Sequence, residues 1–124
     1  MSLKTLANIA VPIYEKLGIR TGKSKTLLFD YSIQVILVKL LCSLVKNNYP
    51  LKEIHEATDG LILSATIPST LTIFEGEIII LLEEKSFKTK VSVDAKIKGQ
   101  LFHWGISESV IKTLLFDIDE IEVG

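Results

Sequence analysis

The sequence predicts an α+β fold in which an antiparallel β-sheet packs on a long helix and a C-terminal helix. Between residues 51 and 97, apolar and polar residues alternate along several short segments, as they do in strands with one buried face. On either side of this region, apolar residues recur at steps of three and four, the pattern of helices that pack on one side. With a further strand candidate at residues 26–29, the expected order is β-α-β-β-β-β-α. We expect an N-terminal arm over residues 1–22 and a single α+β domain over residues 23–124.

The long helix is expected to begin near Tyr31 or Ser32 and to end before Pro50, which cannot continue a helix. Either Asp30 or Ser32 can cap it by accepting a hydrogen bond from a free backbone N–H. Its apolar stripe comprises Ile33, Ile36, Leu37, Leu40, Leu41, Leu44 and Val45, and three apolar residues outside the stripe are Val35, Val38 and Cys42. Because the apolar arc is this wide, we expect the helix to pack centrally.

The residues before this helix give weaker signals. Residues 3–17 have apolar residues near one helical face, but Pro12 would kink or break a helix there. Residues 18–25 are polar and contain glycine, so we expect a loop before the short strand. The N-terminal residues lack the apolar run of a signal peptide. The most apolar stretch, residues 33–45, is shorter than the roughly 18–20 apolar residues that span a bilayer, so no transmembrane segment is expected.

Four consecutive strands are expected after the long helix, at residues 51–57, 61–67, 77–84 and 87–97. Between the first two, Asp59-Gly60 favours a tight turn, because these residues readily adopt positive φ angles. In the last strand one face is apolar and is expected to be buried; it comprises Phe87, Thr89, Val91, Val93, Ala95 and Ile97. In the strand before it, Ile79 and Leu81 make the second face apolar as well. We therefore expect that face to be covered by the N-terminal segment, by another copy of the protein, or by a ligand.

The last helix is expected from about Glu108 to Ile118. Ser107 is a suitable N-cap, and Glu108 complements the positive end of the helix dipole. Ile106 and Ile111 occupy the two positions of a hydrophobic staple. Acidic residues follow at Asp117, Asp119, Glu120 and Glu122. They lack the spacing of a calcium loop and oppose the dipole at the helix C-terminus, so we expect this end to fray into solvent.

Composition narrows the range of functions. The chain has 124 residues, of which 48% are hydrophobic and 23% charged, and its net charge of -1 gives no basic field for nucleic acid. Its single cysteine, Cys42, cannot form an internal disulfide, which fits a reducing, cytoplasmic compartment. Because Cys42 falls in an apolar helix, we expect its thiol to be inert packing.

The sequence patterns for catalysis and for metal binding are incomplete. Gly22-Lys23-Ser24 lacks the first glycine of a phosphate-binding loop and precedes a strand pattern instead of a helix. The two histidines, His55 and His103, and Cys42 are not spaced as metal ligands, so no metal and no cofactor is expected. Glu75 and His103 would form an acid–base pair only if their two turns met. The alternative function is therefore a small enzyme that uses this pair in a cleft between sheet and helix.

Large aromatic residues gather in the turn before the last helix. Phe102 and Trp104 flank His103, and such residues either plug a core or stack on a ligand. Core packing is the simpler interpretation, and Lys and Arg are not interleaved as they are in nucleic-acid sites. The residues expected to contact a ligand or a partner are Phe74, Ile79, Leu81, Phe102, His103 and Trp104.

This turn resembles a motif of an uncharacterised family of small bacterial α+β domains. The motif runs Q-L-F-D-W-G-K-N-K, and residues 100–108 read Gln-Leu-Phe-His-Trp-Gly-Ile-Ser-Glu. Five positions match, whereas His103 replaces an acidic residue and Ile106 replaces a lysine. Phe74-Glu75-Gly76-Glu77 approximates a second motif near S-[FW]-G-E. The resemblance follows the element order over residues 25–118 and implies a reduced helix-grip fold, a sheet curved around a long helix. It implies no reaction, so no catalytic role is carried over.

The surplus apolar surface favours a non-enzymatic binding or interaction domain. Its partner would be a second copy in a homodimer, another protein, or an apolar small molecule. A peripheral membrane role for residues 3–17 is less favoured, because their positive charge is small.

Overall fold

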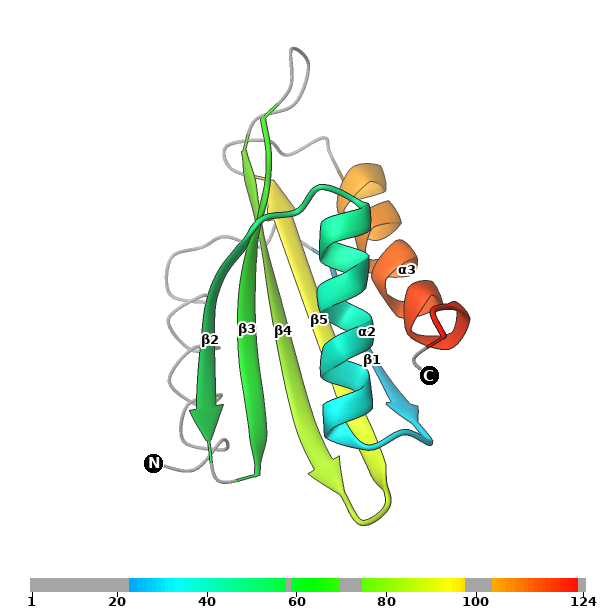
Figure 1. Cartoon of the computed structure of the whole chain (residues 1–124). Helices are drawn as coiled ribbons and strands as arrows, with labels where there is room; N and C mark the ends of the chain where they lie inside the picture. Colours follow the sequence, from blue (N-terminus) through cyan, green and yellow to red (C-terminus); the bar gives the residue numbers. More distant parts are fainter. Residues whose placement is uncertain (1–22, 58, 70–74, 98–103, 123–124) are drawn as a thin grey trace.

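The computed structural model describes residues 23–57, 59–69, 75–97 and 104–122. In this part of the chain, five strands form one antiparallel sheet in the order β1-β5-β4-β3-β2, with two helices packed against it (Figure 1). The elements are β1 (Lys23–Phe29), α2 (Ile33–Lys46), β2 (Leu51–Ala57), β3 (Gly60–Ile67), β4 (Gly76–Lys85), β5 (Lys88–Ile97) and α3 (Trp104–Glu120). The predicted α+β class and element order are confirmed. The expected N-terminal arm, residues 1–22, lies outside the described residues.

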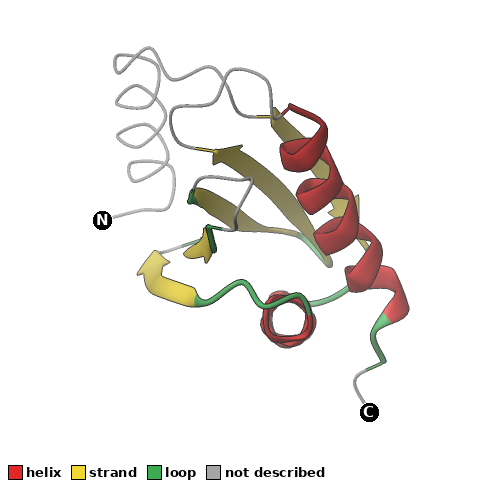
Figure 2. Ribbon diagram, turned by 90° about the horizontal axis from the view of Figure 1, so that it is seen from above, coloured by secondary structure: helices red, strands yellow, loops and turns green. Residues whose placement is uncertain are grey.

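The sheet has one face turned toward the helices, called here the inner face, and an opposite outer face. Figure 2 shows the sheet curved, with α2 and α3 on the same side of it. Residues that pair across antiparallel strands share a face, and the pairs Leu63–Ile80 and Ile80–Val93 run across the middle of the sheet. All three side chains are at most 1% exposed and belong to the hydrophobic core, together with residues of both helices. Thr89, Val91, Ala95 and Ile97 are also buried, so the predicted buried face is confirmed for most of β5.

The predicted boundaries of α2 are confirmed. Ser32 is the N-cap, and its Oγ accepts a hydrogen bond from the backbone N–H of Val35 at 3.3 Å. At the other end the backbone N–H of Tyr49 donates to the carbonyl of Leu44 at 2.8 Å, and Pro50 follows. α3 lies over β5 and β1, and α2 lies beside it over β4 and β5. The helices thus cover the β1 side of the sheet.

Two expectations about strands are wrong. β1 begins at Lys23, inside the predicted loop. The backbone of the polar residues at positions 23–25 pairs with residues 93–95 of β5, so the strand begins before its first apolar residue. Phe87 was expected in the core but is 95% exposed. It lies with Ser86 in the turn between β4 and β5, and Ser86 has a positive φ of 56°. Alternation of faces holds only inside a paired ladder, so a turn residue does not continue it.

Several expectations about the helices are also wrong. α3 starts at Trp104, so Ser107 lies within the helix, is fully buried and cannot be its N-cap. The predicted staple of Ile106 and Ile111 is wrong for the same reason, since it requires Ser107 as the N-cap. The hydroxyl of Ser107 has no hydrogen-bond partner among the described residues. On α2, Cys42 is exposed and Val45 is 84% exposed, because only part of the apolar arc faces the sheet. The predicted fraying is also wrong, since α3 continues to Glu120 and Asp117 is buried.

Candidate functional site

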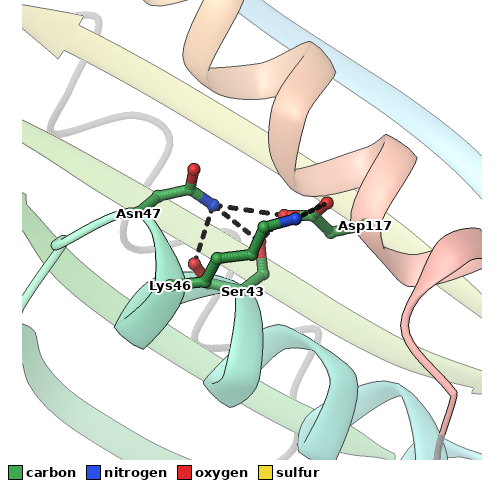
Figure 3. A network of polar contacts seen from close by, with 4 residues as sticks. All are labelled: Ser43, Lys46, Asn47 and Asp117. Carbon is green, nitrogen blue, oxygen red and sulfur yellow. Dashed lines mark hydrogen bonds and ion pairs between the residues drawn. The ribbon is translucent and has the colours of Figure 1, made fainter.

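The flank of α2 that faces α3 is closed by a polar network (Figure 3). The carboxylate of Asp117 accepts hydrogen bonds from Ser43 Oγ at 2.6 Å, from Asn47 Nδ2 at 3.1 Å and from Lys46 Nζ at 3.2 Å. Burial opposes the ionised carboxylate, but these three donors outweigh it and lower the pKa of Asp117 below its usual value. The network therefore holds the C-terminal halves of the two helices together.

A second polar contact closes the same flank nearer the start of α2. Lys39 is only 5% exposed, and its Nζ donates to the carbonyl of Ile118 in α3 at 2.7 Å. The same Nζ lies 3.8 Å from the centre of the Tyr31 ring, a cation–π distance. The carbonyl of Tyr31 in turn accepts from Thr89 Oγ1 of β5 at 2.8 Å. These bonds tie α2, α3 and the sheet together at one corner.

The opposite flank of α2 is apolar. At 3.6 residues per turn, Leu37 and Leu41 fall on the side of the helix away from Lys39 and Ser43. Because α3 lies toward β1, this side faces the β3 and β2 end of the sheet. Both leucines are half-buried against the core.

The inner face of β2 and β3 continues this apolar flank. In the sheet register Leu51 pairs with Ala65, Ile54 with Leu63, and Leu61 with Leu82, and each of these partners is completely buried on the inner face. We use the name "open apolar surface" for these side chains of the inner face together with the two leucines of α2: Leu37, Leu41, Leu51, Ile54 and Leu61.

The open apolar surface is incompletely covered. Leu51 is 42% exposed and Ile54 is 40% exposed, whereas their partners in β3 are at 0%. The contacts of the two described helices concentrate on β1, β4 and β5, so α2 and α3 leave this end of the inner face incompletely covered. Fully burying a large aliphatic side chain contributes about 1.5–3 kcal/mol, so a molecule covering these two residues would gain about 1 kcal/mol from each.

Two polar residues border this surface. Glu56 shares the inner face, because its register partner is Leu61. Tyr49 lies on the connection from α2 to β2 and packs in part against the core; burial raises the pKa of its hydroxyl, which therefore stays protonated at neutral pH. The arrangement is suited to binding an apolar body with a polar group at its end.

Of the predicted contact residues, Ile79 and Leu81 lie on the outer face of β4. Both are half-buried, and their register partners on the outer face include Ile62, Ser92 and Asp94. Burial raises the pKa of Asp94, and the nearby charge of Lys96 partly offsets this. Ile79 and Leu81 therefore do not join the open apolar surface, and what covers them stays a prediction.

The predicted aromatic turn is not tested by the structure. Phe74, Phe102 and His103 lie outside the described residues, and Trp104 is placed only as the first residue of α3, without a description of its side chain. Glu75 is exposed just before β4. The acid–base pair of Glu75 and His103 therefore stays a prediction.

The sequence analysis missed the residues of the open apolar surface as a group. The wide apolar arc of α2 was the available signal, but it does not tell which flank a second helix covers. The burial of Asp117 was missed for a similar reason, since its partners Ser43, Lys46 and Asn47 lie about seventy residues away in sequence.

Other kinds of site find little support in the described part of the chain. There, no three His, Cys, Asp or Glu residues lie close enough together to hold a metal ion, and no helix is long and apolar enough to cross a membrane. His55 Nε2 lies 2.8 Å from Glu53 Oε2 on exposed β2. An open hollow of about 140 Å³ lies between β1 and α3, lined by Ser24, Lys25, Glu108, Ile111 and Lys112.

Comparison with known proteins adds little. No protein-family model matches the sequence, and no curated protein is significantly similar to it. Among solved structures, the chain is similar to the crystal structure of Ara h 8.0201, with 11% sequence identity and a TM-score of 0.41, over 81% of this chain and 98% of that chain. No residue takes a role from that protein at this level of similarity. The resemblance of residues 100–108 to a bacterial family stays a prediction.

Proposed function

We propose that the protein is a binding domain that holds an apolar small molecule on the open apolar surface, between α2 and the β2–β3 end of the sheet. The observation that carries this proposal is the exposure of Leu51 and Ile54 on the same sheet face as completely buried residues. Leu37, Leu41 and Leu61 extend the surface, and each is already packed in part against the core.

A dye and fatty-acid titration tests this proposal. The chain is titrated with a fluorescent dye that brightens in apolar surroundings, and then with a long-chain fatty acid that competes with it. We expect saturable dye binding, and we expect Leu41→Gln to weaken it about tenfold, since a polar amide then faces the ligand.

Leu28→Gln is the matched control. It makes the same change at a residue that is 55% exposed on β1, at the opposite edge of the sheet. Dye affinity should be the same as for the unmodified chain. The absence of saturable binding, or an equal loss in both variants, would contradict the proposal.

We also propose a reducing, cytoplasmic setting for this activity. Its support is the single cysteine, Cys42, whose thiol is exposed. In an oxidising compartment an exposed single thiol forms disulfides between molecules.

A further inference from the structure

β2 forms an edge of the sheet with side chains that are exposed from Leu51 to Glu56. Among the described strands its neighbour is β3, and the two are joined by a hairpin in which Ala57 faces Gly60. Residues next to a two-residue hairpin loop bond to each other, and the bonded pairs then alternate. Glu53 and His55 therefore bond to β3, whereas Ile54 and Glu56 direct their backbone N–H and C=O groups outward. Within the described residues, no second strand pairs with this edge of β2.

The side chains of β2 are complementary to themselves when the strand is reversed about Ile54. Its sequence is Leu51-Lys52-Glu53-Ile54-His55-Glu56-Ala57. If two copies align antiparallel with Ile54 opposite Ile54, then Lys52 lies opposite Glu56 and Glu53 opposite His55. Two-fold symmetry forms each of these pairs twice. The opposite charges of Lys52 and Glu56, directly across strands, stabilise this pairing. Glu53 and His55 already lie 2.8 Å apart within β2, so they add less to it.

The neighbouring registers lack this complementarity. Hydrogen bonds form across the two-fold axis only if each residue with outward backbone groups lies opposite another such residue. The register can therefore change only in steps that keep these residues opposite each other. One step in one direction places Glu53 opposite Glu53, and one step in the other places His55 opposite His55. The register centred on Ile54 is therefore favoured by charge.

The other edge of the sheet provides a contrast. β1 carries Lys23 and Lys25 as its charged residues and has no acidic residue to oppose them. Charges and bulges are common means of discouraging edge pairing, and β2 does have a register shift between Leu51 and Glu53. The shift falls at Lys52, at one end of the proposed contact, and limits the strength of the contact. The order of the charges along β2, however, favours one specific partner.

We infer that the β2 edge binds the β2 edge of a second copy of this chain, antiparallel and centred on Ile54. The result is a weak homodimer with one sheet continuous across both copies. The contact uses outward backbone groups and the charges of β2. The two Ile54 side chains meet at the two-fold axis, on the inner face, and bring the two open apolar surfaces side by side.

Sedimentation of the full chain under reducing conditions tests this inference; a reductant is needed because the exposed thiol of Cys42 would otherwise link copies. We expect a reversible monomer–dimer equilibrium. Lys52→Glu should weaken dimerisation about tenfold, because the change is present in both copies and turns the two symmetry-related pairs with Glu56 from attractive to repulsive. Glu56→Lys should weaken it to a similar degree.

The double variant Lys52→Glu/Glu56→Lys should restore dimerisation, since it reverses the charges and keeps them complementary. Lys25→Glu makes the same charge change at the other edge and should leave the equilibrium unaltered. A monomeric mass at millimolar concentration would overturn the inference. So would a dimer insensitive to Lys52→Glu, or one that the double variant fails to restore. Thermal melts confirm that each variant is folded.

Discussion

The two flanks of α2 differ in what covers them. On the flank toward α3, polar groups of Lys39, Ser43 and Lys46 reach partners in α3, and Asp117 is almost completely buried. On the other flank, Leu37 and Leu41 are apolar and yet only half-buried. The openness of that flank therefore does not come from a lack of apolar residues. It comes from the position of α3, which lies over β1 and β5, so that in the described part of the chain no second helix covers the β2–β3 end.

The largest expected effect compares two adjacent residues of α2. Leu40 is completely buried in the core, and Leu40→Ala should lower the free energy of unfolding by about 3 kcal/mol through lost burial and a cavity. Leu41→Ala, on the open flank, should cost about 1 kcal/mol, since its side chain is partly exposed already. Urea unfolding of both variants measures the difference. Equal losses of unfolding free energy in the two variants would mean that Leu41 is packed as tightly as Leu40, which would contradict an open flank.

The next effect concerns the closed flank itself. Asp117→Asn keeps the shape but places an amide N–H₂ among the donors of Ser43, Lys46 and Asn47, so a hydrogen bond is lost on a buried group. We expect a loss of about 2 kcal/mol in the free energy of unfolding at neutral pH. Asp119→Asn, at an exposed position of the same helix, is the control and should cost less than about 0.5 kcal/mol.

The same variant gives a pH dependence. The pKa of Asp117 is lowered on folding, so its stabilisation is fully present above the unfolded pKa of about 3.9 and is lost as pH falls through the lower folded pKa. The stability advantage of the unmodified chain over Asp117→Asn should therefore shrink below about pH 4. Thermal unfolding between neutral pH and the acid range measures this. An advantage that is constant with pH would contradict an ionised Asp117 in the network.

The smallest expected effect concerns Lys39. Lys39→Met keeps a side chain of similar length but removes the donor to the carbonyl of Ile118 and the cation over Tyr31. We expect a loss of about 1 kcal/mol, because the apolar replacement is well suited to its buried position. Leu37→Met on the open flank is a volume-conserving change and should cost about 0.5 kcal/mol or less. A larger loss of stability for Leu37→Met than for Lys39→Met would contradict the expectation that the flank toward α3 is the more tightly packed one.

Local patterns predicted the elements well where the contacts that define them are local. Ser32 was one of two proposed caps of α2, and the residues 51–57 expected as a strand are those of β2. Ser107 failed as a cap because the helix begins earlier, at Trp104. Phe87 failed because a turn interrupts the alternation of faces, and the length of a turn depends on how the two strands pair.

The sequence by itself determined the α+β class, the order of the elements and most of the buried face of β5. It did so because periods of 2 and 3.6 residues follow from backbone geometry alone. Only the tertiary structure decided that α3 covers one flank of α2, that Asp117 is buried in a polar network and that Leu51 and Ile54 stay exposed. These properties depend on contacts between residues distant in sequence. A hydrophobic pattern specifies that a face is apolar, but it does not specify which element will cover that face.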